Sequence, residues 1–426
     1  MDTIKHALKN KDIRNKMIFT VLMLAIFGIG TSLPVPGINH DTLKEVFNGQ
    51  NAGLFDLFNL FTGGSFQNFT IFALGVTPYI TASIIIQLLT IGFPYFEKLS
   101  KEGDTGRKKM ATITRYLAII LALVQAIGMT FGLFRNAVIT TTVLSFCMII
   151  ILLTAGTAFL MWLGEQINEY GIGNGMSLLI FAGIVMRLPV EIRDIVIKTK
   201  EGTLNFVSDI LIIIFALAII VGIVVVQDGV RKIPVQYAKR VIGTKAYGGQ
   251  STHIPMKVNA AGVIPIIFAL SFLQLPLTLA YIWPDSSVSI FLSKYLSPSG
   301  QPGVWIYMSL NVILTIAFTF FYTNIVFKAD DVAKNLASNG GSIPGIRPGK
   351  TTEEYLQNVN MRLTMISALF LAAVSILPTL ISQFTPIDLT FGGTSLLILV
   401  GVAIDTAKQL ENRLVMNNYG GFLGRN

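Results

Sequence analysis

The chain has 426 residues, of which 52% are hydrophobic and only 13% are charged, and its net charge is +9. Soluble domains carry roughly a quarter charged residues, so most of this surface does not face water and a membrane protein is predicted. The single cysteine, Cys147, excludes an intrachain disulfide, and three scattered histidines disfavour a zinc centre. We therefore expect no metal and no cofactor.

Ten apolar runs are candidates for membrane-spanning helices, each of which needs about 20 residues to cross about 30 Å of hydrocarbon. The first run follows a basic tail and lacks the short core and small-residue cleavage site of a signal peptide, so we expect it to be retained. The runs lie at 17–36, 70–92, 112–134, 143–164, 175–190, 207–227, 259–283, 304–327, 362–382 and 392–412. The fifth run is short. The prediction is an all-α membrane protein with ten transmembrane helices.

The distribution of Lys and Arg predicts the orientation of these helices. With the N-terminus in the cytoplasm, 25 of the 32 basic residues fall in cytoplasmic segments and 7 fall outside. Cytoplasmic loops are enriched in Lys and Arg, so both ends of the chain are predicted to be cytoplasmic. Four of the seven outside residues lie in the loop between helices 5 and 6, where Glu191, Asp194 and Glu201 dilute them.

Because each half has five helices, the first half (helices 1–5) and the second half (helices 6–10) must insert with opposite topology. This is expected of an inverted repeat around a central pathway. The expected divisions are a cytoplasmic tail at 1–16, an N-terminal half at 17–190, a C-terminal half at 207–412 and a short cytoplasmic tail at 413–426. The C-terminal half contains two long cytoplasmic segments, at 228–258 between helices 6 and 7 and at 328–361 between helices 8 and 9.

A short apolar segment at 53–61 lies between the first two runs and is too short to span a membrane. Four of its residues recur with helical spacing: Leu54, Leu57, Phe58 and Phe61. Gly63 and Gly64 then interrupt the pattern. Two interpretations stay open, a short helix that folds back into the bundle and closes a pore, or an interfacial helix that lies flat on lipid.

The predicted membrane interior is almost free of charged side chains. Asp405 is the exception, and its place toward the cytoplasmic end of the last run allows it to reach water. A proton-driven carrier usually needs an intramembrane carboxylate, so that class is disfavoured, whereas a sodium-coupled carrier stays open. Interior β-branched residues are candidates for a ring that closes a channel to ions, against the alternative of ordinary packing. They include Val76, Ile80, Ile84, Ile180, Ile267 and Ile398.

The two long cytoplasmic segments differ in pattern. Segment 228–258 alternates at Ile233, Val235 and Tyr237 and offers a turn at 247–249, which predicts a small basic hairpin. Segment 328–361 holds a stiff Pro/Gly-rich loop that presents Arg347. Basic projections can bind ribosomal RNA or an acidic protein, or they can simply fix topology. No catalytic triad, carboxylate pair or metal cluster is evident, so an enzyme is not predicted.

Several stretches resemble the SecY family, the channel subunit of the bacterial Sec translocon. They follow one another in the family's order, nearly end to end, at 71–89, 164–177, 237–240, 250–253 with 257–259, 344–349 and 391–398. The resemblance implies a protein-conducting channel in the bacterial plasma membrane. Such a channel translocates unfolded secretory proteins across the membrane and releases membrane-protein helices laterally into it, powered by a partner motor or ribosome.

The resemblance also implies roles for particular residues. The hydrophobic pore ring falls on Val76, Ile80, Ile180, Ile267 and Ile398. The plug falls on about 54–66, with Leu54, Phe55, Leu57, Phe58, Leu60, Phe61, Gly63 and Gly64. A lateral gate between helices 2–3 and 7–8 includes Thr81, Gln87, Gln125 and Asn259. Partner docking falls on Arg231, Lys232, Lys239, Arg240 and Arg347.

The partners implied by the resemblance are SecE, a SecG-type subunit, the SecA motor ATPase, the ribosome, precursor proteins with signal sequences and the phospholipid bilayer. One departure from the family is the very short tail at 419–426. Two other classes of function remain as alternatives: a small-solute secondary transporter, which would want a polar midplane site, and a purely structural subunit of a membrane complex.

Overall fold

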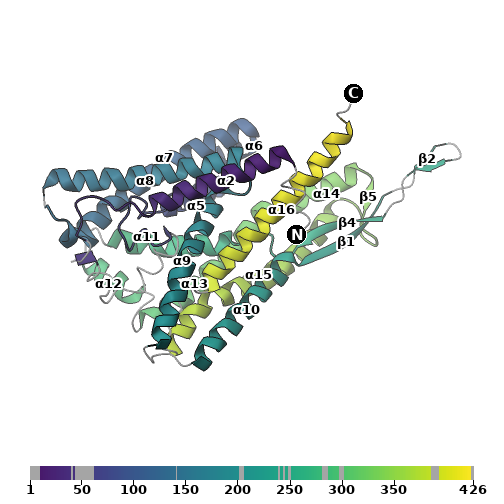
Figure 1. Ribbon diagram of the computed structural model, residues 1–426. Coiled ribbons are helices and arrows are strands. Elements are labelled where there is room, and N and C mark those ends of the chain that lie inside the picture. Colours follow the sequence, from purple (N-terminus) through teal and green to yellow (C-terminus); the bar gives the residue numbers. More distant parts are fainter. Residues whose placement is uncertain are drawn as a thin grey trace.

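A computed structural model describes residues 10–39, 42–43, 62–140, 142–200, 206–237, 240–242, 245–247, 251–280, 286–296, 302–384 and 393–423 of the chain. Long helices make up most of it, and a β-hairpin projects from one end (Figure 1). The short helix α12 (Ser287–Tyr295) lies toward the opposite end of the bundle.

Each of the ten predicted runs overlaps a helix. In chain order these helices are α2 (Lys11–Gly30), α5 (Thr77–Gly92), α7 (Asp104–Gly128), α8 (Val143–Tyr170), α9 (Gly175–Lys200), α10 (Phe206–Asp228), α11 (Ile264–Ala280), α13 (Gly303–Val326), α15 (Lys350–Phe384) and α16 (Gly393–Leu423). Shorter helices α6 (Pro94–Lys101) and α14 (Ala329–Ser338) lie between them, and a π-turn (Met129–Leu133) and a 3₁₀ turn (Arg135–Ala137) follow α7.

Fewer helices than ten pass a strict test of length and apolar composition. Among the described residues, α2, α7, α8, α13 and α15 pass, and α5 with α6 makes a sixth span if this pair, bent by 101°, is counted as one. Helices α9, α10 and α11 contain shorter apolar stretches. For α5 and α11 the shortfall has a local cause, because the run predicted at 70–92 becomes helical only at Thr77 and the run at 259–283 only at Ile264.

The long loops and the C-terminal tail contain more helix than their sequence patterns indicated, and the turn of the hairpin lies elsewhere than predicted. The segment at 328–361 contains α14 and the first turns of α15, because Ala, Leu and acidic residues there favour a helix. The predicted tail at 413–426 is helical through Leu423. The turn of the hairpin does not lie at 247–249, since Ile242 pairs with Lys245 and the chain reverses between these two residues.

The packing contacts of the first half recur five helices later in the second half. Contacts of α5 with α7, α7 with α8 and α8 with α9 correspond to contacts of α11 with α13, α13 with α15 and α15 with α16. The contact of α2 with α9 corresponds to that of α10 with α16. The halves meet along two seams, α5 and α7 against α11 on one side and α9 against α16 on the other. This is the inverted-repeat arrangement that the helix count predicts.

Residues from the predicted inside and outside loops gather at opposite ends of the bundle. At one end, Ile13 of α2 packs with Ile172 and Leu414, and Lys408 of α16 pairs with Asp228 at the end of α10, with Nζ and Oδ1 2.6 Å apart. The other end has its own apolar cluster, which draws on segments far apart in sequence: Val35, Ile38, Phe66, Phe69, Phe134, Val138 and Leu277. The N-terminal end of α2 and the C-terminal end of α16 therefore lie on the same side of the bundle as the β-hairpin.

The two long loops form one small domain rather than two separate projections. Strand β1 (Val230–Tyr237) pairs antiparallel with β4 (Ser251–Lys257) and, at Gln236 and Tyr237, with β5 (Gly341–Ser342), giving the order β4-β1-β5. The strands β2 (Arg240–Ile242) and β3 (Lys245–Tyr247) form a separate tip. Alternate residues of β1 pack on α14 and α15, in a cluster of Ile233, Val235, Met256, Leu336, Ile343 and Leu356. We call this unit, with its sheet and α14, the loop domain.

One glycine of the first half, Gly156, lies where a neighbouring backbone segment closely approaches helix α8. Gly156 of α8 faces the carbonyl oxygen of Ile71, and a Cβ at that position would overlap this oxygen. We expect Gly156→Ala to destabilise the protein by about 1–3 kcal/mol, the usual cost of overpacking, measured as a lower Tm of the purified protein in detergent. The matched control is Gly222→Ala in α10, where the new Cβ would lie 3.6 Å from Phe370, an ordinary contact. Equal Tm values for the two variants would contradict the assigned packing.

Candidate functional site

The five β-branched residues expected to form a ring lie in one buried cluster. Val76 and Ile80 come from the start of α5, Ile180 from α9, Ile267 from α11 and Ile398 from α16, and all belong to the central hydrophobic cluster. None is more than 7% exposed, and Ile398 is fully buried. Both halves of the repeat contribute to this cluster, so it lies between them.

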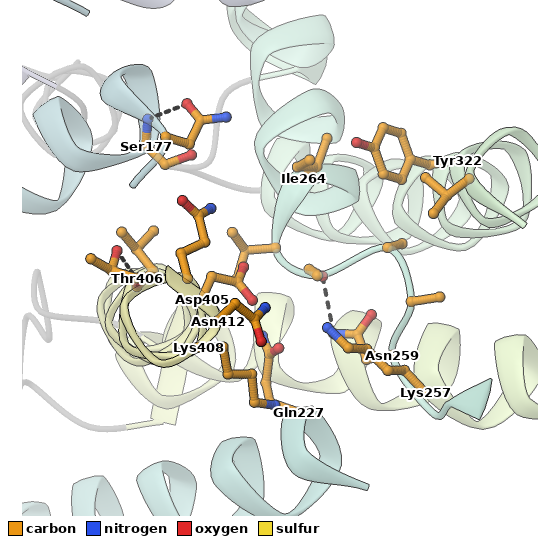
Figure 2. Close-up of a pocket in the computed structure, with 18 residues that line it drawn as sticks. Ser177, Gln227, Lys257, Asn259, Ile264, Tyr322, Asp405, Thr406, Lys408 and Asn412 are labelled. Carbon is orange, nitrogen blue, oxygen red and sulfur yellow. Dashed lines mark hydrogen bonds between the residues drawn. The ribbon is translucent and has the colours of Figure 1, made fainter. Parts of the chain in front are cut away.

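A polar cavity of about 330 Å³ lies on the loop-domain side of this ring (Figure 2). We call it the vestibule. Its wall includes Ser177, Ile264 and Val402. These three positions are one helical turn away from ring residues Ile180, Ile267 and Ile398, because residues three or four apart share a helix face. The apolar ring therefore lies directly beyond the polar vestibule.

The vestibule is lined by neutral amides together with a few charges. Lys257, Asp405 and Lys408 line it, and Lys408 is also paired with Asp228. Asp405 is exposed in this wall, as expected from its place near the end of the last helix. Among the described residues, no group of three or more His, Cys, Asp or Glu side chains is arranged to hold a metal ion.

Local hydrogen bonds fix the backbone around the vestibule. Asn174 begins α9, since its Oδ1 accepts from the backbone N–H of Met176 (3.1 Å) and Ser177 (3.3 Å). The loop before α9 is hydrogen-bonded to the first and the last long helix, α2 and α16. Thr20 Oγ1 accepts from the N–H of Ile172 (3.0 Å), and Arg413 donates to the carbonyl of Gly171 (2.9 Å). These contacts hold α9, and with it Ile180, in a fixed position.

On the far side of the ring lies the described end of the segment interpreted as a plug. A Cβ on Gly63 would lie 2.7 Å from Cα of Gly183, so the two backbones touch one turn beyond Ile180. Gly63 and Gly64 have φ values of 64° and 85°, which favour glycine. The plug residues Leu54, Phe55, Leu57, Phe58, Leu60 and Phe61 lie outside the described residues.

The four residues assigned to the lateral gate do not all lie together. Thr81 and Gln125 are buried in α5 and α7, two helices that pack against α11 of the other half. Gln87 is half-buried in α5, where its Nε2 donates to Ser83 Oγ (3.2 Å). Asn259, by contrast, precedes α11 and lines the vestibule.

The loop that presents Arg347 is held rigidly. Pro344 and Gly345 form the corner of a type II turn, in which the N–H of Ile346 donates to the carbonyl of Ile343 (3.0 Å) and Gly345 has a φ of 80°. The buried Thr352 donates its hydroxyl to the carbonyl of Arg347 (2.8 Å). The Arg347 side chain is itself exposed, so a fixed backbone presents a free cation.

The other predicted docking residues belong to the strands of the loop domain or lie outside the described residues. Arg231 and Lys232 are exposed on β1. Lys239 and the side chain of Arg240 lie outside the described residues. On helix α6, Lys101 donates a hydrogen bond to Glu97 (2.6 Å). This bond holds the pKa of the exposed Glu97 carboxyl below its usual value, and the positive charge of Lys328 lowers this pKa further.

Sequence reasoning missed one buried side chain of the vestibule. Gln227 is only 5% exposed at the end of α10. It was overlooked because a glutamine at the end of a long apolar run looks like an ordinary polar terminus. The signal that could have found it is a polar residue directly before the break at Gly229 that leads into the loop domain.

Comparison with known proteins now places the chain. The sequence profile of the SecY family matches residues 70–407. The protein translocase subunit SecY of Bacillus subtilis (strain 168) is 46% identical over 434 residues, covering 99% of each chain. The chain belongs to the SecY family. The same subunit from Staphylococcus aureus (strain NCTC 8325 / PS 47) is 41% identical over the full length of both chains.

Solved structures of low sequence identity share the fold. A structure described as that of a protein conducting channel matches with a TM-score of 0.69 at 22% identity, covering 94% of this chain and 92% of that one. Sec61 in a canine ribosome-channel complex from the endoplasmic reticulum matches with a TM-score of 0.63 at 21% identity, with the same coverage. Ten transmembrane helices in two inverted halves are therefore the fold of this SecY family member.

Proposed function

We propose that this chain is the protein-conducting channel of a bacterial translocase, and not itself an enzyme. Unfolded secretory proteins cross the plasma membrane through its centre, and membrane-protein helices leave sideways between α5/α7 and α11/α13. The observation that supports the proposal is a buried apolar cluster to which both halves contribute, next to a polar vestibule. We propose that Val76, Ile80, Ile180, Ile267 and Ile398 form a ring within this cluster. The relatives named as translocase subunits support it.

The closed state keeps ions out because the ring offers them no polar ligand. In the proposed arrangement the segment at about 54–66 is a plug on the outer side, and the contact of Gly63 with Gly183 supports that position. A signal sequence is an apolar helix that gains about 0.8 kcal/mol per CH₂ buried between the gate helices and lipid. This differential binding favours the open state.

The proposed orientation puts both termini and the loop domain in the cytoplasm, because the basic residues gather at that end. There the loop domain would bind the SecA motor or the ribosome through Arg347, Arg231 and Lys232, and through Lys239 and Arg240. A SecE helix and a SecG-type subunit complete the proposed complex. The Sec61 structure with a ribosome supports a ribosomal partner.

Site-specific crosslinking in inverted membrane vesicles tests the pathway. A cysteine replaces Ile80 in a Cys147→Ser background, and a precursor with one cysteine in its mature region is stalled midway by a folded tail. We expect a disulfide crosslink that requires motor and ATP. The matched control is Ile151→Cys on α8, where the isoleucine is 64% exposed on the outer surface of the bundle. Export without a crosslink at positions 80, 180 or 398 would place the path elsewhere.

Substitution of the ring tests its role as an ion barrier. Ile180→Ser puts a hydroxyl among apolar side chains, so water and ions gain a ligand and we expect raised ion conductance across planar bilayers. Broader acceptance of defective signal sequences is expected as well. Ile151→Ser, the same change on the exposed face of α8, should leave conductance unchanged. Wild-type conductance and an unchanged client range for Ile180→Ser would refute the ring assignment.

Charge reversal at Arg347, in the loop between β5 and α15, tests docking. Arg347→Glu is expected to abolish motor-driven export while the protein still folds and inserts, because the side chain is exposed and only its backbone carbonyl is used in the loop. Export in vesicles and the level of inserted protein are measured together. Lys350→Glu, an equal charge reversal on an exposed residue three positions later, controls for net charge. Normal export by Arg347→Glu would remove the docking proposal.

A further inference from the structure

An apolar groove of about 490 Å³ lies on the surface of the N-terminal half, between α2 and α8. These two helices pack side by side (Figure 1). None of the described residues that line the groove carries a polar side chain. Ile29 of α2 (65% exposed) and Phe159 of α8 (39% exposed) lie at its rim, whereas Phe72, at its bottom, is buried. The groove therefore runs from the surface of the bundle into its packed interior.

Close packing fixes the bottom of the groove. Phe72 stacks between Phe27 and Phe159, with ring centroids 6.0 Å apart in each pair and interplanar angles of 12° and 10°. Gly30 of α2 lies against the ring of Phe72, so a Cβ at Gly30 would overlap this ring. Gly156 of α8 makes an equally close contact with a neighbouring backbone segment. The groove is therefore preformed by packed aromatic rings and backbone.

The rim of the groove faces lipid and not water. Both α2 and α8 are long and apolar enough to span a membrane. They expose further large apolar side chains, such as Leu22, Met148 and Ile151. The groove is lined from α2 by residues at the end of that helix, which begins on the cytoplasmic side in the proposed orientation. Acyl chains of the outer leaflet therefore reach the groove.

The size of the groove favours a hydrocarbon chain over a partner helix. An α-helix with its side chains is about 10 Å wide, so a single turn of it takes up about 420 Å³. The groove would hold little more than one such turn, and a helix laid across the rim would leave the bottom empty. An empty bottom loses van der Waals contacts, whereas a flexible chain of CH₂ groups can follow the groove down to Phe72.

We propose that one acyl chain of a phospholipid from the outer leaflet occupies this groove as a bound lipid. The described lining residues offer it neither a charge nor a polar side chain, so the site selects the hydrocarbon chain and not the headgroup. The bound chain covers the start of the non-helical stretch at 71–76, where irregular backbone at membrane depth must be shielded. The site requires only that α2 and α8 span the membrane, so it is independent of the proposed channel function.

Native mass spectrometry of the complete membrane complex tests the site. The complex is reconstituted in vesicles of dioleoylphosphatidylcholine, extracted again in detergent and washed, and the retained phospholipids are counted. Ala155→Leu fills the groove from α8, and because Ala155 is exposed the larger side chain does not overpack the core. We expect one phospholipid per chain to be lost, with its occupancy about tenfold lower, since excluding about two CH₂ groups is enough for that factor. Vesicles of dioleoylphosphatidylglycerol should show the same loss.

Ala373→Leu is the matched control, because Ala373 is exposed on α15 and does not line the groove. It should retain as many phospholipids as the wild type. Ala155→Met, with a more flexible side chain, decides the outcome if Ala155→Leu lowers the Tm of the complex. A wild-type number of phospholipids in both Ala155 variants would overturn the proposal. Loss of a small subunit in place of the phospholipid would do so as well, since a partner helix would then fill the groove. So would retention in only one of the two lipids.

Discussion

Backbone groups that leave a helix inside a membrane must find partners within the protein, since lipid offers none, and the centre of this molecule depends on that constraint. The non-helical stretch before α5 meets it through neighbouring segments. The N–H of Ile71 donates to the carbonyl of Leu33 (3.1 Å), and the N–H of Val35 donates to that of Phe69 (3.0 Å). Helix α5 can therefore begin as late as Thr77, with Val76 and Ile80 buried in the central hydrophobic cluster.

The second half uses the same device at a different place. Helix α11 begins only at Ile264, and the segment before it turns through Gly262, whose φ is 63°. Asn259 closes this turn by donating to the carbonyl of Gly262. A continuous helix would fill the space with its own side chains. The late start of α11 leaves room for a polar vestibule against an apolar ring, so a break in helix structure creates the cavity.

The loop domain is joined rigidly to the helices of the second half. A seam of buried polar residues runs between α13 and α15, where Asn311 donates to Ser375 (2.9 Å) and Thr315 donates to Asn311 (3.2 Å). Hydrogen bonds between helices and small side chains favour close packing in lipid. Helix α14 and the Arg347 loop connect these same two helices, and α13 in turn packs against α11.

Sequence patterns predicted the helices well because hydrophobic length is a strong and local signal. The positions of Thr77 and Ile264 as helix starts could not be predicted, since they depend on glycine conformations and on hydrogen bonds to distant segments such as Leu33. The alternation at Ile233 and Val235 predicted a strand, but not its packing on α14, which lies about a hundred residues later. The ring residues came from resemblance, because one isoleucine in an apolar helix looks like any other.

Buried hydroxyls and buried amides differ in how completely they can be hydrogen-bonded inside the bundle. Several buried hydroxyls in the helices, such as those of Thr81 and Thr319, donate to the carbonyl four residues earlier. An amide on Gln227 or Asn259 has a second polar atom that this local bond cannot satisfy. Unpaired buried atoms in the described part of the chain include amide atoms such as Asn259 Oδ1, whose neighbouring Nδ2 is already hydrogen-bonded, and hydroxyls such as Ser271 Oγ.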